Sequence, residues 1–68
     1  MPSEQNNVIP ELSLVALTHQ HRCDGIVLPE GAKGAVVHVY EGGSGYEVEF
    51  GEPFHCVVTL ERDDIRQV

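Results

Sequence analysis

The residues with the clearest capacity for chemistry are two histidines and a cysteine at alternate positions of one short tract. These residues are His19, His21 and Cys23. On an extended segment alternate side chains point to the same side, so all three would face one way. Imidazole nitrogens and a thiolate are good zinc ligands. The tract therefore indicates a candidate metal site formed by His19, His21 and Cys23.

Two features weigh against a metal ion at this tract. Structural zinc sites usually take their ligands from two separate places in the chain, whereas this tract is a single place. A fourth ligand would come from Asp24, His55 or Cys56, and the spacing selects none of them. The spacing also does not distinguish zinc from copper or nickel. The alternative is a polar loop whose imidazoles are solvated or hydrogen-bonded.

No other group of residues forms a catalytic signature. His55 and Cys56 are adjacent, and neighbours on a strand point to opposite faces, so they cannot act as a nucleophile and its base. The Cys23 thiol has imidazoles nearby, but an orienting group and an oxyanion site are also needed. The glycine-rich run at 42–45 lies between two predicted strands, so it indicates a hairpin and not a phosphate-binding loop. We expect a protein that is not an enzyme and uses no cofactor.

Size and charge limit the partners that the chain can take. Its 68 residues are enough for one domain, and eleven acidic against four basic residues give a net charge of −7. Phosphate backbones repel such a surface, so we expect no nucleic-acid partner, and a basic protein partner suits it better. No apolar run approaches the roughly 20 residues of a membrane helix. We expect no membrane contact, a cytoplasmic location and two reduced cysteines.

Apolar and β-branched runs predict an all-β fold with five short strands. The expected strands are residues 11–17, 32–40, 46–50, 54–60 and 65–68. Residues 18–31 are expected to form a long first loop, with the apolar residues 26–28 packed against the sheet. Residues 61–64 are expected to form one 3₁₀ corner before the last strand. Residues 1–10 are predicted to be a flexible leader and residues 11–68 the domain.

The alternation in residues 46–50 predicts how the two central strands pair. Glu47 and Glu49 face water, so the apolar residues between and beside them face the core. An in-register hairpin that buries alternate residues of both strands gives three pairs: Val39 with Tyr46, His38 with Glu47, and Val37 with Val48. A slip of one residue would expose the whole apolar set.

The same parity leaves apolar side chains on outward faces of the predicted sheet. Val36 and Tyr40 would project outward from one strand, and Val57 from another. Apolar residues on an outward face suggest that another surface covers them. Because a small core gains from added burial, we expect a homo-oligomer.

Several short motifs occur in a recognisable order along residues 12–68. They are Val15-Ala16-Leu17, Gly31 and Gly34 before Val36-Val37, then Val39-Tyr40, Tyr46 to Phe50, and Thr59-Leu60 with Asp64 and Ile65. Together they resemble the DUF4926 family of small bacterial proteins of unknown function. The resemblance implies a five-stranded SH3-like barrel with a long first loop, and no established active site. The tract at 19–24 departs from the family in being rich in His and Cys.

The resemblance also implies that the protein works by contact with other proteins, as an accessory or antitoxin-like module. In SH3-like barrels the long first loop often lines the binding groove, so we place the contact surface on that loop and on the hairpin. The candidate partner-binding residues are His21, Arg22, Asp24, Leu28, Tyr40 and Glu41. The alternative function is a metal-binding protein that uses His19, His21 and Cys23.

Overall fold

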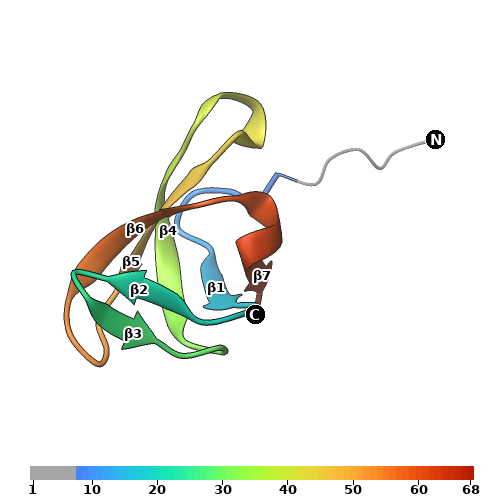
Figure 1. The fold of residues 1–68 in the computed structure, drawn as a ribbon. Helices are drawn as coiled ribbons and strands as arrows, with labels where there is room; N and C mark the ends of the chain where they lie inside the picture. The colour runs from blue at the N-terminus through green and yellow to red at the C-terminus, as the bar shows by residue number, and fades with distance from the viewer. Residues whose placement is uncertain (1–7) are drawn as a thin grey trace.

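The computed structural model describes residues 8–68 of the chain as a small all-β domain. Its elements are β1 (Leu14–Leu17), β2 (His21–Cys23), β3 (Ile26–Leu28), β4 (Lys33–Val39), η2 (Glu41–Gly43), β5 (Tyr46–Phe50), β6 (Cys56–Leu60), η3 (Arg62–Asp64) and β7 (Ile65–Gln67). Five strands form an antiparallel sheet in the order β6-β5-β4-β1-β7, and β2 pairs with β3 separately (Figure 1). The structure confirms three parts of the prediction: the all-β class, a sheet of five strands and a 3₁₀ corner before the last strand.

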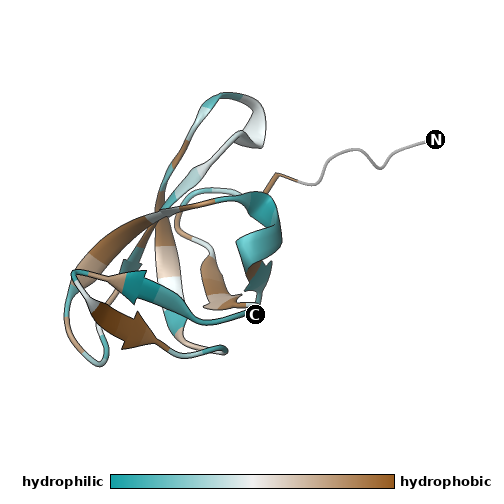
Figure 2. Cartoon of the chain, in the orientation of Figure 1, coloured by the Kyte–Doolittle hydropathy of each residue, from teal (hydrophilic) through white to brown (hydrophobic). Residues whose placement is uncertain are grey.

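The long first loop contains an ordered hairpin, which the sequence prediction did not include. Asp24 and Gly25 both adopt positive φ angles, 54° and 79°, as a two-residue hairpin turn requires. The backbone groups on either side pair as β2 and β3. Ile26 and Val27 were expected to pack on the sheet, yet they are 48% and 39% exposed. Figure 2 shows β3 as a hydrophobic strand beside the hydrophilic β2.

The pairing of β4 with β5 follows the predicted register for two pairs and then departs from it. Val39 pairs with Tyr46 and His38 with Glu47, as expected. A β-bulge between Val36 and His38 then shifts the register, so Val36 and not Val37 lies opposite Val48. The extra residue reverses the parity of the strand. Val36 is therefore fully buried and Val37 is 41% exposed, the reverse of the prediction.

The core includes one residue that precedes the predicted domain, Ile9. Ile9 is buried, and its N–H donates to the Tyr46 hydroxyl at 3.2 Å. Residues 1–7 of the predicted leader lie outside the described residues. The other core side chains come from every sheet strand and from the hairpin: Val15, Leu17, Cys23, Leu28, Val36, Tyr46, Val48, Phe50, Cys56, Leu60 and Ile65. Within residues 8–68, no helix has the length and apolar character of a membrane span.

The sheet requires glycine at position 34, where β4 lies between β1 and β5. Gly34 pairs with Val15 on one side and Phe50 on the other. A Cβ atom there would lie 2.7 Å from the Glu49 carbonyl oxygen and 2.9 Å from a Val48 methyl group. Because that carbonyl belongs to the sheet backbone, a new side chain can be accommodated only by displacing a strand.

We predict that Gly34→Ala lowers the free energy of unfolding by about 1–3 kcal/mol, the usual effect of overpacking a core. Gly51→Ala is the matched control, because a Cβ at Gly51 meets no atom within 4 Å. The control should change stability by no more than about 0.5 kcal/mol. Urea denaturation measures both values, and equal effects of the two substitutions would contradict this account.

Candidate functional site

Two segments far apart in the sequence meet where the chain leaves β1 and where η3 ends (Figure 1). The Thr18 N–H donates to the Asp64 carbonyl at 2.9 Å, and the Thr18 hydroxyl donates to the Asp63 carbonyl at 2.8 Å. These bonds hold the first residues of the loop against η3. His19 and His21 are thereby placed beside the Asp64 carboxylate.

The Asp64 carboxylate has different partners on its two oxygens. Its Oδ2 accepts a hydrogen bond from the Glu61 N–H at 2.9 Å, which orients the side chain at the start of η3. Its Oδ1 lies 2.8 Å from Nε2 of His19 and 3.6 Å from Nε2 of His21. The two imidazole rings lie side by side, with centroids 4.8 Å apart. One oxygen thus maintains the position of the carboxylate while the other faces both rings.

His19 faces an oxygen at each of its ring nitrogens. Its Nδ1 lies 3.2 Å from the Gln20 carbonyl oxygen, and its Nε2 faces Asp64. Both contacts are hydrogen bonds only when each nitrogen carries a hydrogen, so together they favour the charged imidazolium form. The hydrogen bond with Asp64, followed by that with Gln20, accordingly raises the pKa of His19. Partial burial acts to raise the pKa of Asp64, but the Glu61 N–H and the His19 and His21 rings together outweigh it and lower this pKa.

His21 occupies a different position in the cluster. Its Nε2 atom is buried and has no hydrogen-bond partner among the described residues. The nearest charged group, Oδ1 of Asp64, is too far away for a hydrogen bond. A buried polar atom without a partner costs free energy, so this nitrogen stands out as available to a ligand.

We predict that Asp64→Asn lowers the pKa of His19 toward its ordinary value, measured by NMR titration of the imidazole protons. The pKa of His19 is raised and that of Asp64 is lowered, so the ion pair stabilises the folded chain between the two folded-state values. That stability is lost as the pH rises through the pKa of His19 or falls through the pKa of Asp64. Glu49→Gln, which removes the carboxylate partner of His55, is the control and should leave His19 unchanged.

Cys23 does not join the two histidines with which it was predicted to bind a metal. It is buried in the core, and its thiol takes part in a hydrogen bond with Cys56, which is also buried. Burial, with that hydrogen bond as a second cause, raises the pKa of the Cys56 thiol to about 11. Both cysteines are free thiols, and Cys56 remains protonated at neutral pH. Beside the two histidines the structure places Asp64, 45 residues after His19, in place of the predicted Cys23.

The predicted partner-binding residues are distributed over separate parts of the molecule. Arg22 and Asp24 are exposed on the β2–β3 hairpin, whereas Leu28 of the same hairpin is completely buried. Tyr40 and Glu41 are exposed at the far end of β4, near η2 and distant from the hairpin (Figure 1). The structure therefore does not bring the six residues together on one surface.

Tyr40 is engaged within its own sheet. Its hydroxyl donates to Glu47, which also accepts a hydrogen bond from the Thr59 hydroxyl at 2.7 Å. The two hydrogen bonds lower the pKa of Glu47, and the bond from Tyr40 has the larger effect. The same bond raises the pKa of Tyr40. The Tyr40 ring also packs edge to face against His38.

We predict that Tyr40→Phe raises the pKa of Glu47, because the substitution removes the larger of the two donors and keeps the ring. Carboxyl NMR titration measures the change. The pKa of Asp64 in the same spectra is the control, since Asp64 makes no contact with this pair. An unchanged pKa of Glu47 would show that the Tyr40 hydroxyl does not bond it in solution.

Comparison with models of known protein families shows which family this chain belongs to. The model of a domain of unknown function, DUF4926, matches residues 11–67. The chain belongs to the DUF4926 family. No curated protein and no solved structure matches it. Because the family description names no activity, the function of this DUF4926 protein has to be argued from its own residues.

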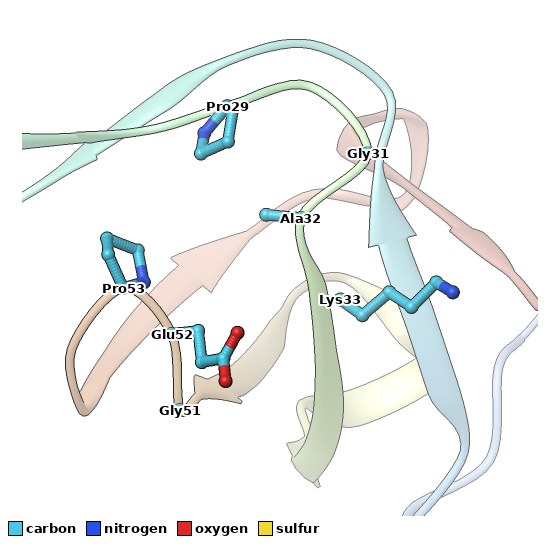
Figure 3. Close-up of a pocket in the computed structure, with 7 residues that line it drawn as sticks. All are labelled: Pro29, Gly31, Ala32, Lys33, Gly51, Glu52 and Pro53. Carbon is cyan, nitrogen blue, oxygen red and sulfur yellow. The ribbon is translucent and has the colours of Figure 1, made fainter.

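The DUF4926 domain also has a shallow pocket beside the hairpin, with a volume of about 690 Å³. It lies between the turn that follows β3 and the loop that joins β5 to β6, and is lined by Pro29, Gly31, Ala32, Lys33, Gly51, Glu52 and Pro53. Figure 3 shows Pro29 and Pro53 on opposite sides of the pocket with the Ala32 side chain directed toward the space between them, while the Lys33 side chain extends away. This lining suits an apolar side chain and brings no nucleophile or imidazole into the pocket.

Sequence reasoning on this DUF4926 chain missed Asp64, Ile26 and Val27 as functional candidates. Asp64 was not considered as a metal ligand beside the histidines, because no local spacing connects it with them. The Asp24-Gly25 dipeptide was the available signal for the hairpin, since it is a preferred two-residue turn between strands. Interpreting this dipeptide as the turn of a two-stranded hairpin, and not only as a turn within a loop, would have placed Ile26 and Val27 on an ordered strand.

Proposed function

We propose that this DUF4926 domain is a non-catalytic module that binds another protein through its β2–β3 hairpin. The observation that carries the proposal is the exposure of Ile26 and Val27 on an ordered strand. Buried Cys23 and Leu28 hold the same hairpin to the domain. Exposed apolar residues on a well-supported element are typical of protein-binding surfaces.

The hairpin has the composition of a small interface. Arg22 pairs with Val27 across the strands, and Asp24 lies at the turn, so charged groups border the apolar pair. The Arg22 guanidinium donates to the Gly25 carbonyl at 3.3 Å, which supports the turn. Protein interfaces combine an apolar centre with a polar rim, and a rigid surface loses less entropy on binding.

The neighbouring pocket extends this surface. Pro29 follows β3 directly, and with Pro53 it provides an apolar depression next to the hairpin. We infer that a partner places one apolar side chain between the two prolines while it covers Ile26 and Val27. In this proposal Leu28 supports the hairpin from within the core, and Tyr40 and Glu41 are not part of the surface.

The order of the elements supports an SH3-like barrel. One strand is followed by a hairpin in the long first loop, a three-stranded meander, a 3₁₀ corner and a last strand that pairs with the first. We assign the domain to this class. The net charge of −7 favours a basic partner, disfavours nucleic acid and fits an accessory or antitoxin-like role. Two free, buried thiols are compatible with the cytoplasm.

A second mode of contact, self-association, is favoured by a row of residues across the outer face of the sheet. Leu14 pairs with Ala35, Ala35 with Glu49 and Glu49 with Val57, and the Val68 N–H donates to the Leu14 carbonyl. Leu14, Val57 and Val68 are among the exposed large apolar residues of the described chain. A second copy packed on this row would bury them.

We predict that the double variant Ile26→Ser/Val27→Ser weakens partner binding at least about tenfold, because it removes the apolar centre of the surface. Partners are captured with the purified protein, identified by mass spectrometry and titrated calorimetrically. Val37→Ser is the control, since it removes a valine of β4 that is 41% exposed and lies in neither proposed contact surface. Equal affinity of the hairpin variant and the native chain would exclude the hairpin as the binding surface.

Light scattering, which measures the mass of the protein in solution, tests self-association. A stable oligomer that dissociates when Leu14 and Val57 are replaced by serine would assign the sheet face to self-association. An oligomer that dissociates only in the hairpin variant would make a second copy of the chain the partner of the hairpin. A monomer under all conditions would exclude self-association.

A further inference from the structure

We propose that His19, His21 and Asp64 bind one divalent transition-metal ion of the zinc type. This site goes beyond the proposed protein contact and shares no residue with the surface formed by Arg22, Asp24, Ile26, Val27 and the proline pocket. It also differs from the site predicted from the sequence, because a carboxylate 45 residues away replaces the thiol of Cys23.

The three ligand atoms already lie close to the separation that a metal ion requires. They are within 4.8 Å of one another, with Oδ1 of Asp64 2.8 Å and 3.6 Å from the two Nε2 atoms. Zinc bonds to nitrogen and oxygen of about 2.0–2.2 Å in a tetrahedron separate the ligands by about 3.3–3.6 Å. Small side-chain rotations of His19 and His21 would therefore centre an ion between the three atoms.

The types of the three ligand atoms indicate which class of metal ion the site would bind. Two imidazole nitrogens and one carboxylate oxygen match the ligand types of zinc and neighbouring transition metals, whereas calcium and magnesium prefer oxygen alone. Three protein ligands leave at least one coordination position for solvent or an added donor. His19 is more than half exposed, so solvent can reach the cluster.

Outer contacts hold two of the three ligands in the orientation that metal binding needs. Nδ1 of His19 is directed at the Gln20 carbonyl, which leaves Nε2 for an ion. The Glu61 N–H holds Oδ2 of Asp64, which leaves Oδ1 for the same ion. Such hydrogen bonds to the second atom of a ligand are a regular feature of metal sites.

His21 distinguishes a metal site from an ordinary ion pair. An ion pair between His19 and Asp64 satisfies both of these groups but leaves Nε2 of His21 buried without a hydrogen-bond partner, 3.6 Å from Oδ1 of Asp64. One metal ion would satisfy all three atoms together. The other histidine–carboxylate pairs of the described chain, His38 with Glu11 and His55 with Glu49, lack this third ligand.

The experiment is a titration of the complete 68-residue chain with Zn²⁺ by isothermal calorimetry, together with thermal melts. We expect one ion per chain and a rise in melting temperature of about 5 °C or more at saturation, because the ion links the loop before β2 to η3. His21→Ala and Asp64→Asn should each weaken binding at least tenfold. His55→Ala is the matched control, since it removes an exposed histidine with a carboxylate partner and should leave the affinity unchanged.

Two further measurements separate loss of the site from loss of the fold. One-dimensional NMR of each variant verifies folding, and Asp64→Asn retains an amide oxygen that can accept the Glu61 N–H. Co²⁺ supplies a visible absorption band that should appear with the native chain and disappear with either site variant. Imidazole resonances of His19 and His21 should shift together on addition of Zn²⁺.

Three results would overturn the proposal: no binding by the native chain, equal binding by the site variants, or an equal loss in His55→Ala. The hairpin variant Ile26→Ser/Val27→Ser should bind Zn²⁺ with native affinity. Failure of the protein-contact proposal would therefore leave this test unaffected, and the reverse also holds.

Discussion

The arrangement of the molecule depends on β1 being hydrogen-bonded on both sides. Val15, Ala16 and Leu17 are all buried, and the strand pairs with β4 on one edge and with β7 on the other. The pair of Leu17 with Ile65 brings the end of the chain to the point where the first loop begins. The Thr18 bonds to Asp63 and Asp64 continue this pairing by one residue, so the cluster of two histidines and a carboxylate results from the closing of the sheet.

Local patterns in the sequence predict the strands well but cannot detect an inserted residue. Alternation in β5 correctly places Tyr46, Val48 and Phe50 in the core, and it gives the first two pairs with β4. The bulge then adds one residue to β4, and every inference from parity beyond it is reversed. Val36 and Val37 have the same side chain, so only the packing of the folded sheet decides which of them is buried.

The candidate site was predictable only in part, for a related reason. His19 and His21 were expected to act together, and they do lie together, but His19 precedes β2 and strand parity does not govern it. Cys23 lies within β2, and the docking of the hairpin on the domain places its thiol beside Cys56. Asp64 reaches the histidines through the long-range pairing of β1 with β7, which no spacing within the first loop can indicate.

The hairpin connects the two proposals without making one depend on the other. Its pairs run from His21 with Leu28 at the base to Cys23 with Ile26 beside the turn. Leu28 and Cys23 are buried, so the hairpin is attached at both ends while Val27 and Ile26 remain exposed. An ion on His21 would add a further attachment at the base and reduce the motion of the strands. Since a surface that is already ordered loses less entropy when a partner binds, such an ion would favour contact without touching the partner.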